Sequence, residues 1–177
     1  MALRKASVYK RIERPYTRTS KVKGKNYIKT TPPKKIVKFT MGNAAKHEKK
    51  EYAYQISLIA KEGFQIRDNA IEAARQIINR HLEEKIGKDF YFLISVYPHH
   101  ILREHKIAAV AQSDRFFSGM SHAFGKTISN AAQIKKGKKI FVIEINEESK
   151  IPFIRKIYHM AASKFGASVV IEAKKLK

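Results

Sequence analysis

The apolar and polar positions in the last two thirds of the chain predict a strand, a helix and a second strand in succession. Residues 52–60 are rich in apolar side chains, as in a buried strand. One stripe of an amphipathic helix follows over residues 68–84, at Ile71, Ala74, Ile78 and Leu82. Either Asp68 or Asn69 can cap this helix, the latter as a capping box with Glu72. Residues 90–97 are β-branched and aromatic and end at a proline, which predicts the second strand.

The same order of elements occurs again near the end of the chain. Residues 139–145 alternate between two faces and predict a strand. A helix begins at about Ser149, with Pro152 in its first turn, where a missing N–H is harmless. Its stripe consists of Ile154, Ile157 or Tyr158, Ala161 and Phe165. Gly166 ends this helix, and residues 168–173 predict the last strand.

Two strand-helix-strand units are typical of an α+β sandwich, in which both helices pack on one face of a mixed sheet. Residues 98–138 lie between the units and fit neither period. An insertion of about 40 residues is longer than ordinary connections in compact domains, and such insertions tend to be functional or disordered. We therefore expect recognition or chemistry to lie in this inserted loop.

Positive charge is concentrated at the start of the chain. The 177 residues carry a formal net charge of +22, and residues 1–50 hold 16 of the 37 lysines and arginines but only two of the 15 acidic residues. The aromatic residues among these cations are Tyr9, Tyr16, Tyr27 and Phe39. This composition predicts a basic N-terminal extension, residues 1–50, that lies along phosphates with rings available for stacking, followed by a core domain, residues 51–177. A solvated, disordered basic tail is the alternative.

Several enzyme-like patterns fail a physical test. Gly119 and Gly125 are one residue too far apart for a phosphate-binding loop, and no buried strand leads into them. Ala123 stands where a nucleophile elbow needs its second glycine. The three histidines between residues 99 and 105 lack an associated carboxylate pair, and the chain has no cysteine. We therefore expect no enzymatic activity, metal, cofactor or small-molecule substrate, and an RNA-modifying enzyme is disfavoured. No apolar run approaches the roughly 18 residues of a membrane span.

The middle segment does contain the signs of nucleic-acid recognition. Its cations are Arg103, Lys106, Arg115 and Lys126, followed by a run at Lys135, Lys136, Lys138 and Lys139. Its glycines let the backbone approach a phosphate closely. Phe124 is expected to plug the core of the loop, whereas Phe116 and Phe117 are either core residues or stacking rings. Together with the basic extension, this segment predicts a surface that lies across structured RNA.

Short sequence words in a fixed order run through nearly the whole chain. They are Arg4 and Tyr9, then RPYTR at 14–18, IEAAR at 71–75, GKD at 87–89, ILR at 101–103, DR at 114–115, GM at 119–120 and AFGK at 123–126. In this order they resemble the archaeal and eukaryotic large-subunit ribosomal protein family L-ten-e, the counterpart of bacterial L-sixteen. The sequence departs from the family pattern at Ser121, His122 and Thr127, so the RNA contact of that turn is left open. Residues 21–33 also match loosely, and residues 164–166 lack a proline usual before the glycine.

The resemblance implies a structural component of the large ribosomal subunit, in the cytoplasm, with an α/β-hammerhead type of fold. Its partners would be large-subunit ribosomal RNA and neighbouring ribosomal proteins. The loop of about Arg103 to Gly119 would help position A-site transfer RNA, while peptide transfer itself belongs to RNA. The residues expected to bind RNA are Arg4, Lys5, Tyr9, Arg14, Tyr16, Arg18, Arg103, Lys106, Arg115, Gly119, Gly125 and Lys126. A free RNA-binding factor or RNA chaperone is the alternative function.

Overall fold

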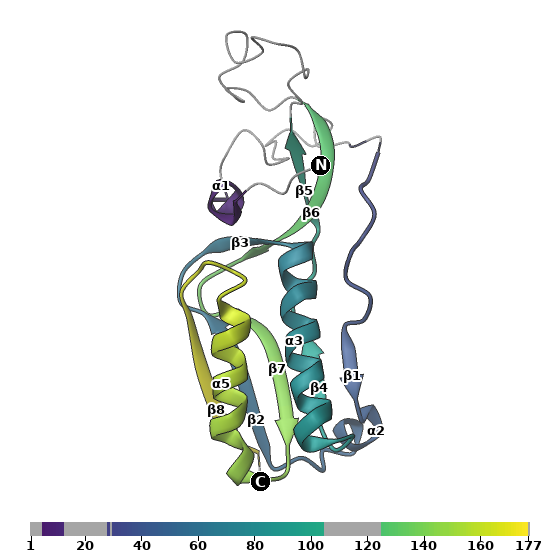
Figure 1. The fold of residues 1–177 in the computed structure, drawn as a ribbon, viewed down its shortest axis with the longest axis vertical. Coiled ribbons are helices and arrows are strands. Elements are labelled where there is room, and N and C mark those ends of the chain that lie inside the picture. Colours follow the sequence, from purple (N-terminus) through teal and green to yellow (C-terminus); the bar gives the residue numbers. More distant parts are fainter. Residues whose placement is uncertain (1–4, 13–27, 29, 105–124, 177) are drawn as a thin grey trace.

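A computed structural model describes residues 5–12, 28, 30–104 and 125–176 as two sheets and a layer of two long helices (Figure 1). The helices are α1 (Ala6–Lys10), α2 (Ala44–Glu48), α3 (Asp68–Ile86) and α5 (Ile151–Ala162), with the 3-10 turn η2 (Glu148–Lys150) before α5. The strands are β1 (Thr40–Gly42), β2 (Tyr54–Ala60), β3 (Phe64–Arg67), β4 (Tyr91–Ile94), β5 (His100–Glu104), β6 (Lys126–Ile134), β7 (Lys139–Ile145) and β8 (Val169–Lys175).

The two predicted strand-helix-strand units interleave in a five-stranded sheet. α3 lies between β2 and β4 in the chain, and α5 lies between β7 and β8, yet the order in the sheet is β1-β4-β7-β2-β8. Every strand that a helix connects is therefore separated from its partner by a strand of the other unit, and the neighbouring pairs are all antiparallel. The α+β class is confirmed, but the expectation of a mixed sheet is wrong for the described strands.

Both long helices cover the same face of this sheet (Figure 1). The predicted stripes are fully buried: Ile71, Ala74, Ile78 and Leu82 on α3, and Ile154, Ile157, Tyr158 and Ala161 on α5. The Tyr158 hydroxyl donates to the backbone carbonyl of Ile56 at 3.0 Å, which ties α5 to β2. Each large apolar side chain buried here contributes about 1.5–3 kcal/mol to stability. No helix within the described ranges has the length and apolar character to cross a membrane.

The start of α3 differs from the predicted capping box. The N-cap position is Arg67, whose side chain makes no capping bond, and Asp68 Oδ1 accepts the Asn69 N–H at 2.8 Å. Glu72 instead accepts two hydrogen bonds from Arg75, at 2.6 and 2.8 Å, and these bonds lower the pKa of the Glu72 carboxyl. Since β3 runs directly into α3, no loop precedes the helix, and Asn69 lies inside it.

The middle segment is more regular than its sequence pattern predicted. β5 and β6 pair as antiparallel strands, and β6 also pairs with β3, so the three strands form a second sheet of order β3-β6-β5. Because β3 continues from β2 and β6 continues into β7, this small sheet extends directly from the large one (Figure 1). The predicted inserted loop, residues 98–138, is thus largely a pair of strands in its described part. Residues 105–124 lie outside the described residues.

α1 covers one face of the small sheet. It lies against β3, and its Tyr9 side chain, 2% exposed, packs with Leu102 of β5 and Ala131 of β6. The side-chain amide of Gln65 donates to the Tyr9 backbone carbonyl at 2.8 Å. Residues from the start of the chain therefore complete an apolar cluster with residues more than 90 positions away.

The later part of the extension covers the other face. The side chains of Asn130 and Ala131 point to opposite faces of the sheet, as those of adjacent strand residues do. Its side-chain amide donates to the backbone carbonyls of Pro32 at 3.2 Å and Pro33 at 3.3 Å. The Thr127 hydroxyl donates to the Thr30 carbonyl at 2.9 Å. We call residues 30–33 the strap, and the small sheet is held between α1 and this strap.

Residues 34–42 then descend beside α3 to the edge strand β1 (Figure 1). Ile36 and Met41 are buried in the main core, and the Arg75 guanidinium lies 3.3 Å from Met41 Sδ. β1 pairs with β4 in the large sheet. These residues belong to the predicted extension, and they pack against the main core and the large sheet.

Replacing Asn130 with alanine removes the amide that holds the strap and leaves the two proline carbonyls without this donor. We expect N130A to lower the free energy of unfolding by about 1–3 kcal/mol, measured by urea denaturation, and to speed backbone amide exchange in residues 34–38. Gln133→Ala, at an exposed position of the same strand, is the matched control and should change stability by less than about 0.5 kcal/mol. If both variants lowered the free energy of unfolding equally, the hydrogen bonds of Asn130 would not be what holds the strap in place.

Replacing Tyr9 with alanine empties the cluster beneath α1. Because truncation of a buried aromatic side chain typically costs about 3–5 kcal/mol, we expect Y9A to lower the free energy of unfolding by about 3 kcal/mol. Ser7→Ala, at an exposed position of α1, should leave stability nearly unchanged. If Y9A weakened RNA binding at unaltered stability, the ring would be acting on RNA and not in the fold.

Candidate RNA-binding surface

The predicted RNA-binding residues that the structure describes lie around the three-stranded sheet. These are Lys5, Tyr9, Arg103, Gly125 and Lys126. The others fall outside the described residues: Arg4, Arg14, Tyr16, Arg18, Lys106, Arg115 and Gly119. Lys5 directly precedes α1, Arg103 is in β5, and Lys126 begins β6. Folding therefore brings the start of the chain and the middle segment, which are distant in sequence, to one end of the molecule (Figure 1).

Three of these residues are exposed: Lys5, Gly125 and Lys126. Within the described part of the chain, no ion pair involves either lysine. Gly125 has a φ of +104°, a backbone conformation that glycine adopts without strain, and it leads directly into β6. The exposed ammonium groups are available to an external anion.

Tyr9 and Arg103 are buried, with 2% and 4% of their surfaces exposed. The guanidinium carbon of Arg67 lies 5.4 Å from the centroid of the Tyr9 ring and covers it. Burial, together with the nearby charge of Arg103, lowers the pKa of His100. The interpretation of Tyr9 as a free stacking ring and of Arg103 as a surface cation is therefore corrected. The Tyr9 ring faces inward because α1 packs on the small sheet, whereas Arg103 is buried within β5.

A second group of lysines lies at the other end of β6. Lys135, Lys136 and Lys138 surround the β6–β7 turn, and the Gly137 N–H of that turn donates to the Ala60 carbonyl at 2.8 Å. The turn therefore lies beside the β2–β3 turn, which carries an exposed lysine of its own. We call Lys61, Lys135, Lys136 and Lys138 the turn lysines, and all four are exposed.

The cations of the middle segment form two clusters and not one. β6 has nine residues and spans about 30 Å at about 3.3 Å per residue, so Lys126 and the turn lysines are far apart. Glu62 lies between β2 and β3, but it pairs with Lys10 at 3.1 Å, and this hydrogen bond lowers the pKa of the Glu62 carboxyl. The turn lysines themselves form no ion pair within the described residues.

The sequence analysis missed a cation held next to aromatic rings beside the strap. Lys34 Nζ lies 4.8 Å from the centroid of the Tyr97 ring, and Tyr97 stacks on Phe39 at 5.4 Å. Phe39 therefore packs on the protein, which corrects its interpretation as a ring open to bases. No local sequence signal links these residues, because the two sides of the cluster are about 60 positions apart.

Exposed lysines on turns and strand ends suit one kind of ligand, the phosphate backbone of a nucleic acid. Phosphate contacts position a protein on RNA and need no deep pocket. Cations without carboxylate partners neutralise phosphates at no cost in broken ion pairs, and they release condensed counterions on binding.

The chain is similar to known ribosomal proteins. Residues 12–171 match the family described as Ribosomal protein L16p/L10e. The "Large ribosomal subunit protein uL16" of Nanoarchaeum equitans is 42% identical over 164 residues, covering 92% of this chain and 88% of that protein. The proteins of the same name from Metallosphaera sedula and Staphylothermus marinus are 39% and 41% identical, each covering 100% of this chain and 97% of the relative. The chain belongs to the L16p/L10e family of ribosomal proteins.

Proposed function

We propose that this chain is a structural constituent of the large ribosomal subunit and binds large-subunit ribosomal RNA. The family match supports the ribosomal role, and the chain spans 97% of the length of two relatives that are named as large-subunit proteins. The observation that carries RNA binding is the set of exposed lysines without carboxylate partners at both ends of β6, on a chain with a net charge of +22. An excess of this size repels itself unless a polyanion neutralises it.

Within this proposal, the exposed residues around the small sheet contact phosphates, and the buried ones position them. Lys5, Lys126 and the turn lysines are the described contacts, and Gly125 lets the backbone approach the RNA. The contacts carried over from the sequence are Arg4, Arg14, Tyr16 and Arg18 in the extension and Lys106, Arg115 and Gly119 in the middle segment. Tyr9 acts indirectly, since it holds the extension against the small sheet, and Arg103 is buried in β5.

We also propose that the segment carried by β5 and β6 lies near A-site transfer RNA and helps to position it. The supporting observation is that the hairpin projects beyond the helix layer at one end of the molecule (Figure 1). In this function the chain holds RNA in place and takes no part in bond making. Neighbouring ribosomal proteins are its further partners, in the cytoplasm.

The double variant Arg14→Ala with Arg18→Ala tests the extension. If the wild-type chain engages roughly eight phosphates, its affinity for protein-free large-subunit ribosomal RNA falls with salt at a log-log slope of about −7, taking the duplex DNA coefficient as a guide. Loss of two contacts should reduce the slope to about −5 while the unfolding midpoint stays unchanged. Filter binding across a salt series measures both slopes.

The matched control removes the same charge at the far end of α3. Lys85→Ala with Lys88→Ala, both exposed, should keep the wild-type slope. An unchanged slope in the Arg14 and Arg18 variant would exclude the extension from RNA binding. Equal reductions in the two variants would mean that total charge, and not this surface, determines binding.

A further inference from the structure

The two edges of the large sheet differ in length. β1, at one edge, has three residues and is followed closely by α2. β8, at the other edge, has seven residues, and among the described strands it pairs only with β2 (Figure 1). A long edge strand offers its unpaired N–H and C=O groups to another chain, and short edge strands are one way in which proteins avoid this. β8 is therefore the edge of this sheet at which a further strand can be added.

Two hydrogen bonds show which main-chain groups of β8 point away from β2. The Leu176 N–H donates to the Ala53 carbonyl at 2.7 Å. The Lys61 N–H donates to the Ser168 carbonyl at 3.1 Å. Because successive residues of an antiparallel strand direct their main-chain groups to alternate sides, the even-numbered residues of β8 bond with β2. The odd-numbered residues therefore point their N–H and C=O groups out from the edge of the sheet.

The exposed side chains of β8 lie on the face of the sheet opposite the helices. Val169 and Ile171 pack against the main core, so the even-numbered side chains point away from it. In order along the chain, these are Val170, Glu172, Lys174 and, just after the strand, Leu176. The two apolar side chains are 42% and 45% exposed, and both charged residues are exposed. Neither charged side chain forms an ion pair within the described residues.

This order of apolar, acidic, basic and apolar side chains is complementary to itself in one antiparallel register. In that register Ala173 lies opposite Ala173 of a second copy. Val170 then meets Leu176. Glu172 meets Lys174, and both contacts occur twice because the arrangement is symmetric. Opposite charges and apolar side chains that face each other across two strands stabilise their pairing.

The main chain selects the same register. Odd-numbered residues face odd-numbered residues in it, so the outward N–H and C=O groups of the two edges can bond with each other. A shift of two residues keeps this match but places Glu172 opposite Glu172, or Lys174 opposite Lys174. Like charges directly opposite each other are destabilising. The side chains and the main chain therefore agree on a single alignment.

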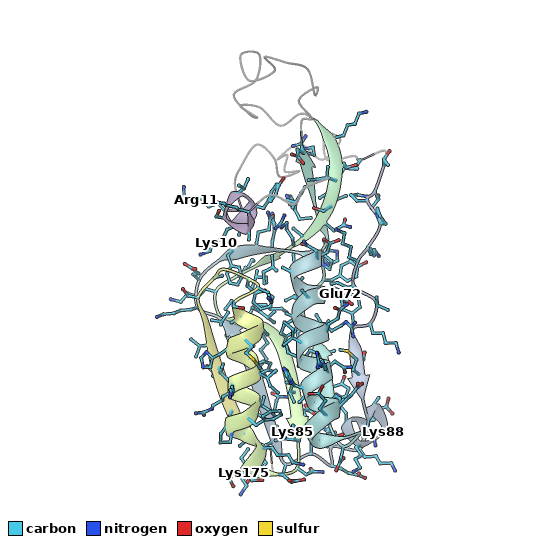
Figure 2. The ribbon with its side chains drawn as sticks, viewed as in Figure 1. Lys10, Arg11, Glu72, Lys85, Lys88 and Lys175 are labelled. Carbon is cyan, nitrogen blue, oxygen red and sulfur yellow. The ribbon has the colours of Figure 1, made fainter. Side chains whose placement is uncertain are left out.

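We propose that two copies of this chain pair through their β8 strands, antiparallel about Ala173, and join their large sheets into one. Because both copies use the same edge, each pairing covers both β8 strands, and growth stops at the dimer. The paired segment lies away from α1, since Lys175 is at the opposite end of the molecule from Lys10 and Arg11 (Figure 2). The inference does not depend on the proposed ribosomal RNA binding.

The charge of the chain sets the conditions for pairing. Two chains of net charge +22 repel each other, and Arg155 and Lys156 add exposed charge on the neighbouring helix α5. Salt shortens the range of this repulsion from about 8 Å at physiological ionic strength to about 3 Å at 1 M. Self-association should therefore strengthen as salt rises, whereas RNA binding weakens.

Analytical ultracentrifugation of the full chain over a range of protein and salt concentrations tests the pairing. Wild type should form dimers, and more of them at raised salt. Glu172→Lys and Lys174→Glu, each made alone, should raise the dissociation constant about tenfold, since two attractive cross-strand pairs become repulsive. The double variant exchanges the two charges and should pair as wild type does. An equimolar mixture of the two single variants should form mixed dimers.

Net charge alone would give a different pattern. Lys174→Glu lowers the net charge and would strengthen association, whereas Glu172→Lys raises the net charge and would weaken it. That pattern would overturn the proposal, and so would a wild-type chain that stays monomeric at every salt concentration. Either result would leave the ribosomal function standing, because that function is measured by RNA binding and by comigration with the large subunit.

A disulfide tests the register. The chain has no cysteine, so Ala173→Cys provides a unique thiol. Directly opposite residues of this kind have Cα atoms about 5.5 Å apart, which a disulfide can span. In the matched control, Lys175→Cys, the two thiols would be four positions out of line, about 13 Å at about 3.3 Å per residue.

In a glutathione redox buffer, Ala173→Cys should form covalent dimers and Lys175→Cys should remain monomeric under denaturing electrophoresis. Equal cross-linking of the two variants would mean random collision, and cross-linking of Lys175→Cys alone would mean a different register. Either result would overturn the proposed pairing.

Discussion

The small sheet β3-β6-β5 joins the main core through Phe64 and Ile66 of β3 and Ala132 and Ile134 of β6. The rest of its two faces gains stability by packing against another element. The chain solves this with its own N-terminal extension. Tyr9 of α1 buries the apolar positions of one face, and the strap accepts hydrogen bonds from Asn130 and Thr127 on the other. Without these contacts, both faces of the paired strands β5 and β6 would be open to water.

In this arrangement the side chains that stabilise the fold and the charged side chains of a strongly basic sequence face different ways. The apolar and hydrogen-bonding groups of the extension turn inward, onto Leu102, Ala131 and Asn130, while lysines such as Lys5 and Lys126 stay exposed. Tyr9 and Arg103 are both buried, with 2% and 4% of their surfaces exposed. A chain with a net charge of +22 can fold in this way because described lysines such as Lys5 and Lys126 remain exposed to solvent.

Elements with a strong apolar period could be predicted from the sequence, and those stabilised by distant polar contacts could not. The stripe of α5 and the strand over residues 139–145 were placed correctly because they face one apolar core. β6 was missed because Ser129, Asn130 and Gln133 interrupt any strand-like run, and the strap that binds Asn130 lies about 100 residues earlier. For the surface, total charge predicted the ligand class, but only the fold shows which cations are buried and that the lysines divide between the two ends of β6.

The central claim is that this chain is a stably assembled part of the large ribosomal subunit. It is tested most directly by density-gradient fractionation of source-cell lysate at low and at raised salt, with detection of the chain in every fraction. Comigration with the large subunit at both salt concentrations is the predicted result, because many phosphate contacts and a packed interface act together. Release into the light fractions already at low salt would contradict the account and indicate a free RNA-binding factor or RNA chaperone.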